Sequence, residues 1–101
     1  MTKIVLSRKT QEHILPDHVD TEVLVMIMKS HIEFLRADEF LLTGITISMA
    51  SDIFQHYIPK LRMRHDVTED IEGIKFDGVP IIEDKDLAKN IILFQGKCVK
   101  E

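Results

Sequence analysis

The sequence predicts an α+β fold, in which a small, mostly antiparallel sheet packs with two or three helices. Apolar and polar residues alternate over residues 45–49, which is the period of a half-buried strand. Asp77 and Gly78 separate two short apolar runs, and this dipeptide is typical of a two-residue hairpin turn. Residues 23–36 are strongly apolar and follow Asp20, a common helix N-cap, so they predict a helix.

The first half of the chain is expected to begin with a strand over residues 3–7, which are apolar and β-branched. Residues 8–15 could form a short helix, which Pro16 would end because the residue before a proline avoids the helical region. A strand remains an alternative for residues 23–28, because periodicity does not separate a short buried helix from a buried strand.

After the strand at residues 45–49, Ser48 or Ser51 can cap a second helix, which Pro59 would close. Residues 60–65 alternate between charged and apolar side chains and therefore predict a strand. The polar residues 66–70 predict a surface loop.

Three further strands are expected near the C-terminus, over residues 74–76, 79–82 and 90–94. Pro80 limits the middle one to an edge strand or to the start of a strand. Residues 96–101 are expected to form a short flexible tail. The whole chain, 1–101, is expected to be one domain.

Composition and charge exclude several classes of protein. An apolar fraction of 45% and a charged fraction of 30% are typical of a globular protein and speak against disorder. The net charge of −4 argues against a general nucleic-acid coat. Cys98 is the single cysteine, so no internal disulfide can form. The N-terminus does not resemble a signal peptide and no apolar run approaches a membrane span, so we expect a cytoplasmic protein without a membrane partner.

The acidic cluster near residue 84 was tested as a calcium loop. Asp84 and Asp86 occupy positions one and three of a twelve-residue loop. Ala88, Lys89 and Gln95 then stand where an oxygen ligand, a glycine and a bidentate glutamate are required. The spacing rejects this metal site, and we expect no metal and no cofactor.

The sequence offers no arrangement typical of catalysis, and we expect that the protein is not an enzyme. The histidines lack zinc-ligand spacing. His31 lies on an apolar face, so we expect it to be hydrogen-bonded in the core or at an interface. The alternative is that it acts as a ligand or as a catalytic base. Ser48 and Ser51 lack the glycines of a nucleophile elbow.

Two groups of residues are candidates for binding. The basic segment, which consists of Lys60, Arg62, Arg64 and His65, could bind a nucleotide, RNA or an acidic partner. Its charges could equally belong to an exposed strand that resists aggregation. Val25, Met26 and Ile32 form a second apolar side of the helix over residues 23–36, which the rest of the domain or another subunit would cover.

The second half of the chain resembles a late segment of tailed-phage major capsid proteins and of small phage and prophage proteins. The resemblance covers residues 44–95 and runs from an alternating strand through a short helix to a final motif. That motif consists of Gly78, Val79, Pro80, Ile81, Ile82, Asp84, Leu87, Asn90 and residues 91–94. The resemblance implies a phage-like origin and an α+β frame, but it transfers no catalytic residue and does not imply a coat protein.

These observations predict a non-enzymatic, phage-type accessory protein that works through protein association as a homo-oligomer. Its partner could also be a virion component or a host protein that it inhibits. The alternative is a binding module for an anionic ligand, either a nucleotide or RNA, at the basic segment.

Overall fold

The computed structural model describes residues 4–17, 19–37 and 44–100. Along the chain these residues form β1 (Ile4–Ile14), α1 (Thr21–Arg36), β2 (Gly44–Ala50), α2 (Ser51–Leu61), β3 (Val67–Asp70), β4 (Gly73–Phe76), β5 (Val79–Asp84) and β6 (Ile91–Lys100). Within them, no helix has both the length and the apolar character that crossing a membrane requires.

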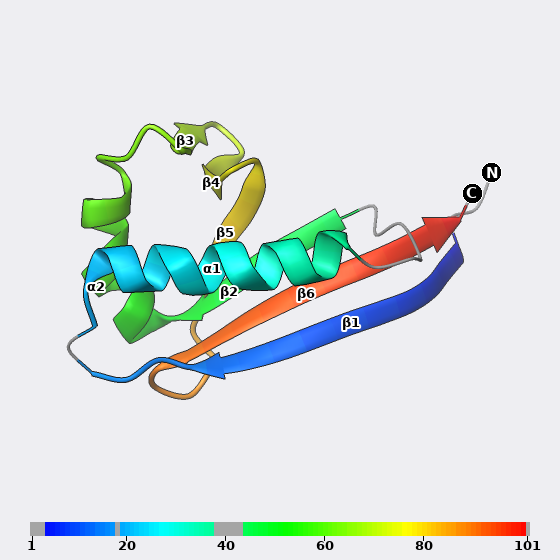
Figure 1. The fold of residues 1–101 in the computed structure, drawn as a ribbon, viewed down its shortest axis with the longest axis horizontal. Helices are drawn as coiled ribbons and strands as arrows, with labels where there is room; N and C mark the ends of the chain where they lie inside the picture. The colour runs from blue at the N-terminus through cyan, green and yellow to red at the C-terminus, as the bar shows by residue number, and fades with distance from the viewer. Residues whose placement is uncertain (1–3, 18, 38–43, 101) are drawn as a thin grey trace.

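The strands form one six-stranded sheet in the order β1-β6-β2-β5-β4-β3 (Figure 1). Four of the neighbouring pairs are antiparallel, and β2 with β5 is the parallel one. A parallel pair requires a crossover, and here α2 and the β3–β4 hairpin provide it. The predicted α+β class with a mostly antiparallel sheet is therefore confirmed.

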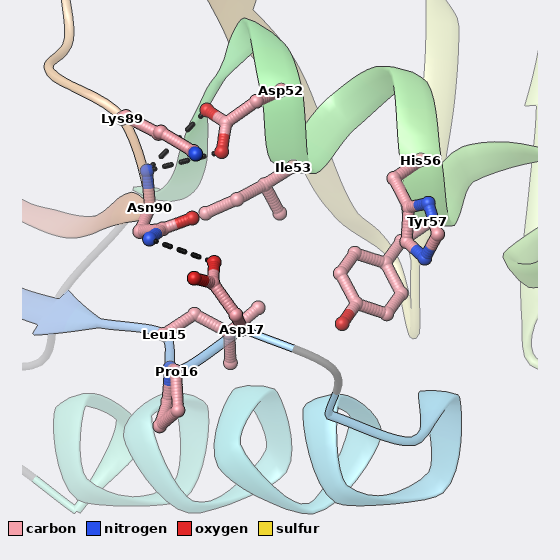
Figure 2. A pocket seen from close by; sticks show the side chains of 9 residues that line it. All are labelled: Leu15, Pro16, Asp17, Asp52, Ile53, His56, Tyr57, Lys89 and Asn90. Atoms are coloured by element: carbon pink, nitrogen blue, oxygen red, sulfur yellow. Dashed lines mark hydrogen bonds between the residues drawn. The ribbon is translucent and has the colours of Figure 1, made fainter.

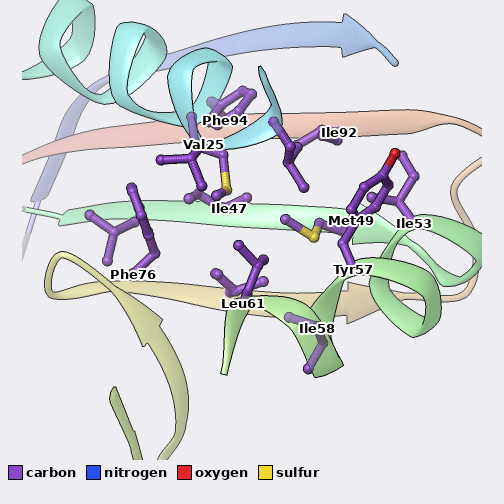
Figure 3. Close-up of a cluster of buried hydrophobic side chains, with 14 of the residues drawn as sticks. Val25, Ile47, Met49, Ile53, Tyr57, Ile58, Leu61, Phe76, Ile92 and Phe94 are labelled. Carbon is purple, nitrogen blue, oxygen red and sulfur yellow. The ribbon is translucent and has the colours of Figure 1, made fainter. Parts of the chain in front are cut away.

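Both helices contribute to one apolar core on the sheet (Figure 3). Ile47 of β2 lies between Phe94 of β6 and Ile81 of β5 in the strand register. Ile47 and Phe94 are fully buried. Tyr57 of α2 joins this core and donates its hydroxyl hydrogen to the carbonyl oxygen of Val19 at 2.7 Å, so its polar end is satisfied. The core thus spans the middle strands and fixes both helices over them.

The prediction of a short helix over residues 8–15 is wrong. Residues 8–14 belong to β1, which pairs antiparallel with β6 from Ile4 opposite Lys100 to Ile14 opposite Ile91, and Leu15 follows the end of the strand. The partner strand supplies the backbone hydrogen bonds, and this tertiary pairing outweighs local helix signals. Residues 96–100, expected in a flexible tail, lie in β6 for the same reason, and residue 101 is outside the described residues.

The prediction of a strand over residues 60–65 is also wrong. Helix α2 continues through Pro59 to Leu61, and residues 62–66 form turns. Leu61 is fully buried, and the amide of Arg62 still donates to the carbonyl of Ile58 at 2.9 Å. Burial of the last turn therefore offsets the hydrogen bond that Pro59 cannot make. The expected loop at residues 66–70 instead contains β3, which pairs with β4.

Several local predictions are confirmed. The segment over residues 23–36 is helical, which decides against the strand alternative for 23–28. The Asp77-Gly78 turn joins β4 to β5. Pro80 lies near the start of β5, opposite Lys75 of β4, and the ladder to β2 begins only at Ile81. Because β5 lies inside the sheet, the edge-strand alternative for it is wrong.

Candidate functional site

The basic segment lies at the end of α2 and in the following turns, where carboxylates already engage both arginines. Arg62 pairs with Glu69 at 3.1 Å. Arg64 pairs with Asp66 at 2.9 Å and with Glu22 of α1 at 2.6 Å. A phosphate would have to compete with these carboxylates, so the segment is poorly suited to an anionic ligand.

The pKa values of the Arg64 cluster agree with this pairing. The hydrogen bond to Asp66 raises the pKa of Arg64 above its ordinary value. The hydrogen bond from Arg64 lowers the pKa of the Asp66 carboxyl. The other members of the segment are exposed, and the Lys60 ammonium lies 5.9 Å from the centre of the Tyr57 ring. The ion pairs of Arg64 with Glu22 and Asp66 join α1 to the turn after α2.

The three predicted interface residues separate in the structure. Val25 and Ile32 are each only 2% exposed and belong to the core of the subunit. Met26 is 66% exposed. Phe34, on the same helix, is 58% exposed. The buried arc of α1 is therefore rotated relative to the prediction, and only Met26 of the three is available to a partner; the interface itself stays a prediction.

Four apolar residues of α1 lie outside the fully buried core: Val23, Met26 and Phe34 are exposed, and Ile27 is partly buried. These four residues are called the α1 stripe below. Ile27 and Phe34 lie four residues before and three residues after His31, so they flank it on the helix surface. His31 contacts β1, and the α1 stripe therefore runs along the β1 side of the helix. Sequence patterning detected that α1 has two apolar sides but assigned their members incorrectly.

Strand β1 provides the second part of this surface. It is the outermost strand of the sheet beside β6, and in the described part of the chain no strand pairs with its other edge, which is called the β1 edge below. An unpaired edge presents a row of backbone donors and acceptors to another chain. His31 contacts Gln11 and His13 of β1, so the helix side that carries the α1 stripe faces toward β1.

His31 connects the helix to this strand. Its Nδ1 lies 2.6 Å from Oε1 of Gln11, and its Nε2 lies 3.4 Å from Nδ1 of His13. Its ring stacks on Phe94 of β6 with the ring centres 4.2 Å apart. Burial, and next the charge of His13, lower the pKa of His31. The expected hydrogen-bonded histidine at the border of the core is thus confirmed, and it holds α1 over β1.

A cavity of about 340 Å³ lies between the end of β1, the start of α2 and the loop before β6 (Figure 2). Asn90, with a φ of 69°, is one of the residues that line it. Its backbone amide donates to both oxygens of Asp52 at 3.2 and 3.3 Å, and its Nδ2 donates to Asp17 at 3.2 Å. Its carbonyl accepts from the amide of Leu15 at 2.7 Å.

These bonds make Asn90 a structural link between the segment after β1, the start of α2 and the segment before β6. Both carboxylates at the cavity accept hydrogen bonds from Asn90, and the nearby Tyr57 hydroxyl is bound to Val19. The polar groups of the cavity therefore serve mainly to join α2, β1 and β6. Among the residues that the structure describes, no three histidine, cysteine or acidic side chains lie where they could hold a metal ion.

No protein-family model matches the chain, and no curated protein and no solved structure is similar to it. The resemblance of residues 44–95 to phage proteins therefore stays a prediction.

Proposed function

We propose that this protein is a non-enzymatic, phage-type accessory protein that acts through protein association, and that its partner is a second copy of itself. The observation that carries the proposal is the exposure of the α1 stripe beside the β1 edge. Exposed apolar side chains on an element next to an unpaired strand are typical of an interface.

Physical size supports the same proposal. A chain of 101 residues buries a limited share of its surface, so association adds substantially to the apolar area removed from water. Covering Met26 and Phe34 of both copies would contribute in proportion to that area. The anion-binding alternative is weaker, because the charges of Arg62 and Arg64 are already matched.

Light scattering on the purified protein, with Phe34→Asp as the variant, tests the proposal. Phe34 is 58% exposed in the subunit, so the substitution leaves the core intact while it places a charge in the interface. We expect a dimer for the parent protein, and for the variant a dissociation constant larger by about tenfold or more, which corresponds to about 1.4 kcal/mol.

Ile71→Asp is the matched control. Ile71 is a fully exposed apolar residue between β3 and β4, at the opposite edge of the sheet from β1. The control is expected to remain a dimer. A parent protein that is monomeric at high concentration, or equal dissociation of both variants, would contradict the proposal.

A further inference from the structure

We infer that two copies join through their β1 edges as antiparallel strands, with Thr10 of each copy on the two-fold axis. This inference rests on the proposed self-association and specifies its geometry. It would produce one continuous sheet across both subunits, in which the β1 edge no longer ends the sheet.

The symmetry of such a pair restricts its register. A two-fold axis between antiparallel strands is perpendicular to the sheet, so the same face of both copies points the same way. A residue that lies a given number of positions before the axis in one copy is then opposite the residue that lies the same number of positions after the axis in the other copy. Directly opposite residues of two paired strands have their side chains on the same face of the sheet, and side chains alternate between the two faces along each strand. The two-fold axis must therefore pass next to one residue and not between two consecutive residues.

The charges along β1 select Thr10 as that residue. Arg8 and Glu12 are each two positions from Thr10, so this register places each opposite the other residue of the second copy. Lys9 then lies opposite Gln11, and no like charges meet. If the axis were moved by one residue in either direction, Arg8 and Glu12 would no longer lie opposite each other. Opposite charges at facing positions stabilise a strand pair and suppress competing registers.

The position of α1 supports the same axis. Figure 1 shows α1 running along the sheet in the direction opposite to β1. His31 contacts Gln11 and His13, and the midpoint of these two residues along β1 lies two positions from Thr10. Two strand residues span about 7 Å, and the three helical residues from His31 to Phe34 span about 4.5 Å, which is less than one strand residue short of that distance. Phe34 therefore lies at about the level of Thr10.

The consequence is that both elements converge on one axis. With Thr10 on the two-fold axis, Phe34 of one copy faces Phe34 of the second copy across it, and the α1 stripe of each copy covers that of the other. A second copy thus fits the β1 edge by charge and the α1 stripe by apolar surface. A strand from another protein would pair with the free backbone donors and acceptors of the β1 edge, but it would match neither the charges of β1 nor the α1 stripe.

Charge exchange tests the register. Arg8→Glu and Glu12→Arg should each raise the dissociation constant of the dimer, because each places like charges opposite one another. The double variant should restore dimerisation, because the pairs are exchanged. Within its own subunit Arg8 lies opposite Lys97 of β6, so Arg8→Glu introduces no like-charge contact at that position. Equal weakening in the double variant and the single variants would overturn the register.

Cross-linking tests the axis itself. In a Cys98→Ser background, Thr10→Cys should form a disulfide between copies on mild oxidation, because residues facing each other across antiparallel strands have Cα atoms about 4.5–5.5 Å apart. Ile14→Cys is the control: the two copies of residue 14 would lie eight positions apart, or about 27 Å. Cross-linking at residue 14 but not at residue 10 would refute the axis.

The two proposals fail in different ways. If the parent protein is a dimer that dissociates with Phe34→Asp but neither responds to charge exchange nor cross-links at residue 10, self-association stands and the β1 register is wrong. If the parent protein is monomeric and residue 10 does not cross-link, both proposals are wrong.

Discussion

His31 shows at the scale of one residue how the packing of a side chain sets its chemistry. The same ring stacks on Phe94 and bonds Gln11, so it closes the space between α1 and β1. This position removes water from the imidazole and places His13 beside it, and both effects disfavour the protonated form.

We predict that protonation of His31 destabilises the fold. The lowered pKa means that the folded protein holds this proton less tightly than the unfolded chain, whose histidine pKa is about 6.5. The contribution of the neutral ring is fully present above that value and is lost as the pH falls through the lowered pKa. The free energy of unfolding, measured by urea titration, should therefore fall as the pH is lowered below about 6.5.

His31→Gln should flatten this pH dependence, because glutamine does not titrate in the same range. His65→Gln is the control, since His65 is exposed in the turns after α2 and should leave the slope unchanged. If the His31 variant retains the parent slope, the pH dependence has another origin.

The β4–β5 hairpin shows at the scale of an element how two residues determine a connection. Asp77 has a φ of 50° and Gly78 a φ of 79°, and two positive values are the mark of a type I′ turn. Arg36 at the end of α1 donates to the carbonyl oxygen of Asp77 at 3.2 Å, so the turn is also held from outside.

Gly78→Ala should lower the free energy of unfolding by about 1 kcal/mol, because a Cβ disfavours this backbone conformation. No atom lies within 4 Å of the added Cβ, so the expected cost comes from the backbone and not from a clash. Gly44→Ala is the matched control, since Gly44 also has open space and lies in β2. Equal effects in urea unfolding would show that the positive φ is not the cause.

At the scale of the whole molecule, stability should be greatest where strands have partners on both sides. Strand β2 pairs with β5 and β6, and β6 pairs with β1 and β2. We predict that the amides of Ile47 and Phe94, which are fully buried, exchange with solvent most slowly in native-state hydrogen exchange, and that amides of β3 exchange faster. Protection of β3 equal to that of β2 would contradict this distribution.

Local sequence patterns were reliable where a signal lies within a few residues. The Asp77-Gly78 turn, the alternation over 45–49 and the helix over 23–36 all describe elements of the structure. The patterns failed where a distant partner decides. Residues 8–15 are extended because β6 pairs with them, and α2 passes Pro59 because Leu61 reaches the core.

The candidate surface was predictable in part. The sequence indicated two apolar sides on the helix over residues 23–36, and this is correct. It could not assign Val25 and Ile32 to the core or Phe34 to solvent, because the rotation of α1 depends on the strands below it. Asp66 and Glu69 lie close to the basic segment in the sequence, but Glu22, which also pairs with Arg64, is 42 residues away along the chain and could not be found from local patterns.

The α+β class, the Asp77-Gly78 turn and the helical segment over 23–36 follow from residue type and short-range spacing. The end of the sheet at β1, the exposed side of α1 and the pairing of Arg64 with Glu22 depend on the tertiary structure. Those features arise from contacts between residues far apart in the chain, whose free energy no local pattern contains.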